Sequence, residues 1–92
     1  MSYAYVLSER ARAGLSKMDI VLQEETLDEL DRLASQPKVR GRRVGEAVVC
    51  DFVRDRGAER AYVFLTVFPD EASHTLRVRD IGHCMLARNW DD

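Results

Sequence analysis

One stretch of the sequence, RAYVFLTVF at residues 60–68, limits the fold more than any other. Successive side chains of an extended strand point to opposite faces of a sheet. Both sets of alternate residues are largely apolar here: Ala61, Val63, Leu65 and Val67, then Tyr62, Phe64, Thr66 and Phe68. A strand that is apolar on both faces lies inside a sheet. We therefore expect a sheet with this strand at its centre.

Two helices are predicted before this strand. After a short strand at residues 3–7, Ser8 can cap a first helix. Asp19 can cap a second helix, which Pro37 ends because the residue before a proline avoids helical geometry. Acidic residues make the solvent face of this second helix: Glu24, Glu25, Asp28, Glu29 and Asp31. Since few residues separate the helices, they should form an antiparallel hairpin.

The strands that follow complete an α+β fold. They are predicted at residues 44–53, 60–68 and 75–81, so the element order is β-α-α-β-β-β in one domain spanning residues 1–92. The helical hairpin would pack on one face of a mainly antiparallel sheet. The other face would hold arginines and the last turn, Gly82-His83-Cys84, and a site is expected there.

Charge and composition exclude some classes of protein. The net charge of −2 argues against an ordinary nucleic-acid-binding domain, which is usually basic. The arginines nevertheless gather after the second helix, so one basic face is compatible with the sequence. The chain has neither an apolar run that could span a membrane nor a signal-peptide pattern, so the expected compartment is the cytoplasm, with no membrane partner.

Two cysteines and two histidines are the potential metal ligands. Cys50, His74, His83 and Cys84 match no zinc-binding spacing. The two thiols are interpreted as reduced, small hydrophobic side chains. We expect no metal and no cofactor.

Four segments are typical of a known family in their order and in their residues: YAYVLSERARAGLSKMD, LDELDRLASQP, RDRGAERAYVFLTV and HTLRVRDIGHC. Together they resemble the RelE/ParE superfamily of bacterial toxins from type II toxin–antitoxin modules, over nearly the whole chain. The resemblance implies a growth inhibitor that an antitoxin protein silences, as a homodimer or a heterotetramer with the antitoxin. Its target would be either mRNA on the ribosome, which RelE-like members cut, or DNA gyrase, which ParE-like members inhibit.

The resemblance also points to individual residues. Arg60 takes the place of a central-strand arginine and could clamp a phosphate, or it could be a solvated partner of Asp55. His83 takes a Gly-His position and could transfer a proton, or merely end a strand. Arg88 is a substitute cation in the catalytic set. Further target contacts are expected from Arg54, Arg56, Arg77, Arg79 and Trp90.

Two departures from the family pattern weigh against nuclease chemistry. Cys84 stands where RelE-like enzymes commonly have an arginine on the scissile phosphate. Asp51 stands on a strand that usually offers basic side chains to RNA. These departures favour a ParE-like toxin that binds gyrase. A RelE-type endoribonuclease and a non-toxic binding relative stay as alternatives, and whether the chain is an enzyme stays open.

Overall fold

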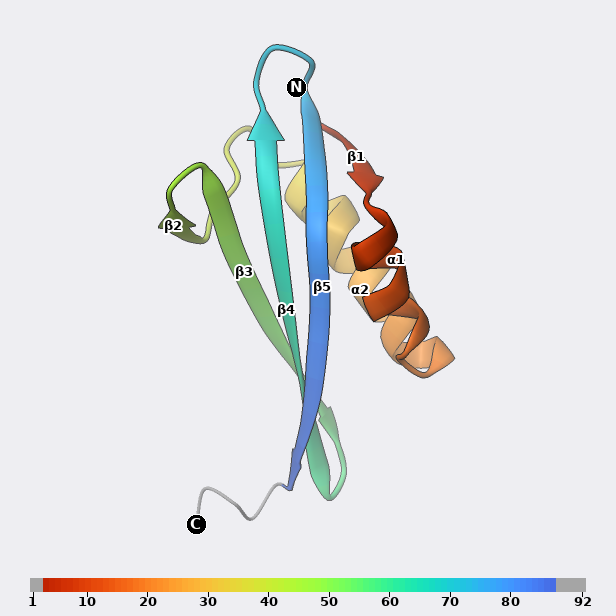
Figure 1. Cartoon of the computed structure of the whole chain (residues 1–92). Coiled ribbons are helices and arrows are strands. Elements are labelled where there is room, and N and C mark those ends of the chain that lie inside the picture. Colours follow the sequence, from red (N-terminus) through yellow and green to blue (C-terminus); the bar gives the residue numbers. More distant parts are fainter. Residues whose placement is uncertain (1–2, 88–92) are drawn as a thin grey trace.

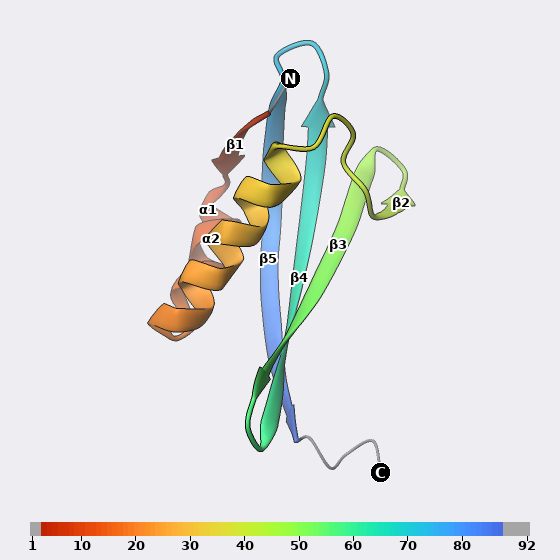
Figure 2. The ribbon, with the colours of Figure 1, turned by 180° about the vertical axis from the view of Figure 1, so that it is seen from behind.

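The computed structural model describes residues 3–87, which form a five-stranded sheet with two helices on one side (Figures 1 and 2). The strand order is β1-β5-β4-β3-β2, and β1 alone runs parallel to its neighbour. The elements are β1 (Ala4–Leu7), α1 (Glu9–Ser16), α2 (Ile20–Ala34), β2 (Arg42–Val44), β3 (Ala47–Arg56), β4 (Glu59–Asp70) and β5 (Thr75–Ala87). The predicted α+β fold and the central position of β4 are confirmed.

The two helices begin where the capping residues predict. The Ser8 side chain accepts a hydrogen bond from the Ala11 amide at 3.0 Å, and the Asp19 carboxylate accepts one from the Leu22 amide at 2.8 Å. Both bonds satisfy amides that the first helical turn leaves without a partner. Among the described residues, no helix is long and apolar enough to cross a membrane.

The core lies between the helices and one face of the sheet. The alternate β4 residues Ala61, Val63, Leu65 and Val67 are fully buried on this face. Leu22, Leu30 and Leu33 of α2 pack in the same apolar cluster. Because the helices cover only this face, the intervening β4 residues lie on the other face, which is called the open face below.

A close approach of α1 to β5 explains Gly14. A Cβ atom added to Gly14 would lie 1.8 Å from the backbone oxygen of Ile81. No side chain fits there without moving the helix away from the strand. Glycine, which weakens helices elsewhere, is required here for packing.

The second half of the chain contains an edge strand that is absent from the prediction. The predicted strands do not include Arg42 and Arg43, but Arg42–Val44 form the short strand β2. Gly45, with a φ of +62°, turns the chain so that Arg42 pairs with Val49. Glycine adopts this left-handed conformation at little cost.

The last strand is longer than predicted and contains a β-bulge. It continues past Gly82 to Ala87, which pairs with Glu59. Arg79 is the extra residue, because Asp80 pairs with Thr66 while Val78 pairs with the adjacent Val67. Strict alternation along residues 75–81 would place Ile81 on the same face as Arg77 and Arg79. The bulge shifts the alternation by one residue and returns Ile81 to the core, where it is 4% exposed.

Candidate functional site

The open face of the sheet is the candidate functional surface. Alternation with the buried residues and the strand register assign to it these side chains: Arg42 on β2, Val49, Asp51, Val53 and Asp55 on β3, Arg60, Tyr62, Phe64, Thr66 and Phe68 on β4, and Arg77, Asp80, Cys84 and Leu86 on β5. Four strands thus contribute to one surface that neither α1 nor α2 covers.

Arg60 lies at the end of this face nearest the β3–β4 turn. Its Nε atom is 3.5 Å from Oδ1 of Asp55, the residue directly opposite on β3. Tyr62 is the next residue on the same face and is half-buried opposite Cys84. The sequence analysis did not single out Tyr62, although a spacing of two residues from Arg60 was the available signal.

His83 does not share a face with Arg60. It lies directly opposite the buried Val63, so its side chain points toward the side that carries the helices. Arg60 instead lies opposite Leu86. The structure therefore does not bring these two predicted residues together on one surface.

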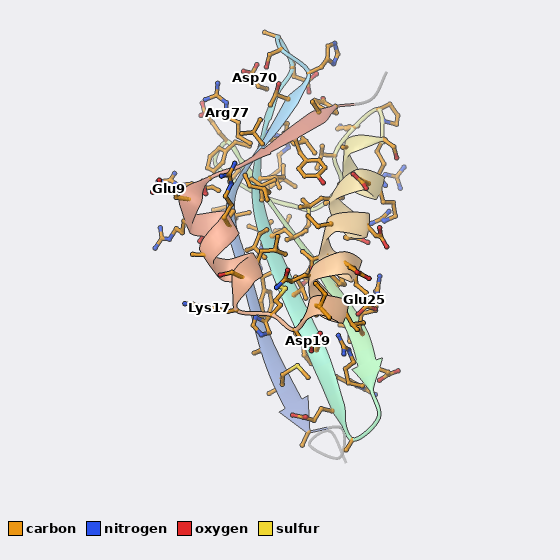
Figure 3. All side chains as sticks on the ribbon, turned by 90° about the vertical axis from the view of Figure 1, so that its right-hand side faces the viewer. Glu9, Lys17, Asp19, Glu25, Asp70 and Arg77 are labelled. Carbon is orange, nitrogen blue, oxygen red and sulfur yellow. The ribbon has the colours of Figure 1, made fainter. Side chains whose placement is uncertain are left out.

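Arg54 and Arg56 also lie on the helix side, in contact with the start of α2. Arg54 Nε is 3.1 Å from Oε2 of Glu25, and Arg56 Nη2 is 3.2 Å from both Oδ1 of Asp19 and Oε1 of Glu25. Figure 3 shows Asp19 and Glu25 on the helical side of the β3–β4 hairpin. These arginines hold the hairpin to α2, on the face opposite Arg60.

Arg77 and Arg79 lie at the other end of the strands from Arg60. Arg77 Nη2 is 3.8 Å from Oδ2 of Asp70, and both residues are seen near the β4–β5 turn in Figure 3. The Arg79 guanidinium lies 5.7 Å from the centre of the Phe68 ring. Phe68 lies eight positions along β4 from Arg60, which corresponds to about 27 Å of extended strand.

These two arginines line a groove of about 1030 Å³, together with Ser8, Arg43 and Phe68. The groove also contains three acidic residues, Glu46, Asp70 and Glu71, which offset the charges of its three arginines. The other two predicted residues, Arg88 and Trp90, lie outside the described residues.

The cysteines lie on opposite faces. Cys50 is buried beneath α2 and pairs with Leu65, whereas Cys84 is exposed on the open face. Burial raises the pKa of the Cys50 thiol, and the nearby carboxylates of Glu29 and Asp51 raise it further. Within residues 3–87, no group of three or more His, Cys, Asp or Glu residues could hold a metal ion.

The open face can bind a phosphate at Arg60, and the side chains next to Arg60 are uncharged or acidic. Arg60 can donate two parallel hydrogen bonds to a phosphate, and the Tyr62 hydroxyl can donate another. Asp51 lies opposite the exposed ring of Phe64, and Val53 lies opposite Tyr62. The side chains around Arg60 are therefore mainly aromatic and aliphatic.

Comparison with known proteins identifies the fold. No protein-family model matches the chain, and no curated protein matches its sequence. Three solved structures are similar. The intact RelBE toxin–antitoxin complex of E. coli matches with a TM-score of 0.68 and 17% identity, over 88% of this chain and 95% of that chain. A mutant of the E. coli toxin RelE in the free state matches with a TM-score of 0.69 and 16% identity, over 89% of this chain and 83% of that chain. The toxin–antitoxin complex RelBE2 of Mycobacterium tuberculosis matches with a TM-score of 0.66 and 18% identity, over 91% of this chain and 93% of that chain. At these identities the similarity concerns the backbone. The chain has the fold of the RelE toxins.

Proposed function

We propose that this chain is the toxin of a bacterial toxin–antitoxin pair and that it acts as a RelE-type endoribonuclease on mRNA at the ribosome. The observation that carries the proposal is the RelE fold over about nine-tenths of the chain, with Arg60 on the open face of its central strand. Two of the similar structures are toxin–antitoxin complexes, which supports an antitoxin as the partner.

The chemistry of RNA cleavage without a metal assigns roles to the open face. The reaction needs a base for the 2′-hydroxyl, a positive charge for the phosphorane-like transition state and an acid for the leaving oxygen. Arg60 supplies the positive charge. Tyr62, on the same face, supplies a hydroxyl donor to the phosphate or the leaving oxygen. Arg60 and Tyr62 account for the charge and the acid but not for the base, and His83 faces the other side of the sheet.

Gyrase inhibition, which the sequence departures favoured, becomes the second candidate. The observation in its favour is that Asp51, Val53 and Cys84 share the open face with Arg60, where a nuclease of this family would carry cations. A ParE-like toxin needs no such cations because it binds its target without chemistry. The reported structural relatives are RelE toxins, so the endoribonuclease takes precedence.

The test is inducible expression of the full chain in a bacterium without the cognate antitoxin. Incorporation of labelled methionine and of labelled thymidine is followed during the first minutes. An early fall in methionine incorporation alone is the expected result, since cleavage of mRNA stops translation first. An early fall in thymidine incorporation alone would favour gyrase, and growth without either effect would contradict a toxin.

A further inference from the structure

A pocket of about 550 Å³ opens around the edge of β3, at the point where β2 begins. β2 pairs with β3 only as far as Val49, so within residues 3–87 no strand covers this edge from Cys50 onward. The pocket is lined from the open face by Asp51 and Phe64, from α2 by Glu29 and Arg32, and from the segment before β3 by Arg40 and Arg42. Its volume is in the range of sites that hold small molecules.

Phe64 gives this pocket a flat aromatic surface. Its side chain is 43% exposed, although its neighbours along β4, Val63 and Leu65, are fully buried. An exposed phenylalanine ring in the middle of a sheet is a surface on which an unpaired nucleobase can stack, as in many single-strand-binding proteins.

Asp51 supplies hydrogen-bond acceptors beside this ring. It lies directly opposite Phe64 in the β3–β4 ladder, which corresponds to a distance of about 5 Å between the Cβ atoms. A carboxylate only accepts hydrogen bonds and can accept two parallel ones. Among the four RNA bases, guanine alone presents two adjacent N–H donors, N1–H and N2–H, on its Watson–Crick edge. The carboxylate therefore selects guanine.

The positive charge of the pocket lies at its rim. Arg32 forms an ion pair with the nearly buried Glu29, with Nε 3.2 Å from Oε1, so these two residues add no net charge to the pocket. Arg40 and Arg42 are exposed at the rim. Their guanidinium groups can contact the phosphates on either side of a bound base.

The loop that carries these two arginines is held tightly against β3. A Cβ atom on Gly41 would lie 2.6 Å from Cγ1 of Val48 and 2.7 Å from the backbone oxygen of Val49. The Cys50 thiol also donates a hydrogen bond to the backbone oxygen of Arg40 at 3.3 Å. The rim of the pocket is therefore formed before any ligand binds.

We propose that this pocket binds an unpaired guanine of single-stranded RNA. Phe64 stacks on the base, Asp51 accepts hydrogen bonds from N1–H and N2–H, and Arg40 and Arg42 contact the flanking phosphates. This inference rests on the proposed RNA target and makes Asp51 the residue that determines base preference. It also explains an acidic residue at a position where the family resemblance implies a basic one.

The test measures binding of short RNAs to the purified full-length chain by fluorescence anisotropy. Four pentanucleotides, UUGUU, UUAUU, UUCUU and UUUUU, differ only in the central base. We expect UUGUU to bind about tenfold more tightly than the others. Asp51→Asn should reduce the ratio of the UUGUU affinity to the UUUUU affinity to about one, because the amide presents a donor to one of the guanine N–H groups. Asp28→Asn, an exposed change on α2, is the matched control and should keep the preference.

Two further variants test the other contacts. Arg42→Gln should weaken binding of all four RNAs equally and reduce its salt dependence, as expected for a phosphate contact. Phe64→Leu, which keeps an apolar side chain, should weaken all four because stacking is lost.

Several outcomes would overturn the inference. They are equal affinity for the four RNAs, a guanine preference that survives in Asp51→Asn, unchanged binding by a folded Phe64→Leu variant, and no binding of any RNA by the wild-type chain. None of these four binding outcomes tests the proposed function. That function is tested separately, by the block of methionine incorporation in cells. Conversely, a guanine preference in vitro without any block of translation would support the pocket and contradict the toxin.

Discussion

Arg60 and Asp55 face each other across the β3–β4 hairpin, with Nε and Oδ1 3.5 Å apart on the open face of the sheet. Their side chains are 34% and 62% exposed, so solvent screens the attraction between them. A phosphate, which carries more acceptor oxygens than one carboxylate, can therefore compete for the guanidinium. This pair orients the cation without burying it.

Replacing Arg60 by alanine is expected to abolish toxicity while the fold persists. Loss of one positioned donor to a developing charge typically lowers a rate by about a hundredfold or more. Arg60→Lys should retain part of the activity, because it keeps the charge but loses the forked geometry. Growth after induction and cleavage of mRNA on purified ribosomes are the measurements. Arg12→Ala, an exposed arginine change on α1, is the control, and full toxicity of Arg60→Ala would contradict the assigned role.

Replacing Gly14 by alanine is expected to destabilise the protein. In an unconstrained helix this change stabilises by about 1 kcal/mol. Here the new Cβ atom would lie 1.8 Å from the Ile81 backbone oxygen, so α1 must move away from β5 at a cost of about 1–3 kcal/mol. Urea denaturation measures the difference in unfolding free energy. Gly82→Ala is the matched control, since a Cβ atom there would have no heavy atom within 4 Å apart from those of its chain neighbours.

The cap of α2 is expected to lose strength in acid. The hydrogen bond from the Leu22 amide, and secondly the Arg56 guanidinium, lower the pKa of the Asp19 carboxyl below its usual 3.8. A lowered pKa in the folded state contributes stability above the pKa of the unfolded chain, and this stability disappears as the pH falls through the folded value. Wild type should therefore be more stable than Asp19→Ala near pH 7, and the difference should shrink near pH 3. Urea denaturation of both proteins at the two pH values is the measurement, and a constant difference would contradict the role of the charge.

The two cysteines are expected to differ in reactivity. Cys84 is exposed, whereas Cys50 is buried with a raised pKa, and a thiolate is the form that reacts. An alkylating reagent near pH 7.5 should label one thiol per native chain and two per unfolded chain, as counted by mass spectrometry. Cys84→Ser should remove the native label. Rapid labelling of Cys50 in the native protein would show that the cover of α2 over β3 opens readily.

The helix starts, the central strand and the fold class could be predicted from the sequence. Ser8 and Asp19 fix the helix starts through bonds within three residues, and the two-sided apolar pattern of residues 60–68 identifies β4 as an interior strand. These features depend on local hydrogen bonds and on burial, which a single sequence encodes directly.

Which candidate residues share a surface follows from the tertiary structure and not from their spacing in the sequence. The bulge at Arg79 shifts the alternation of β5 by one residue, and the side that each later residue faces follows from that shift. His83 thereby shares the face of Val63 rather than that of Arg60, and Asp51 lies opposite Phe64. Strand register arises from contacts between residues far apart in the chain, so the spacing of residues along one strand could not reveal it.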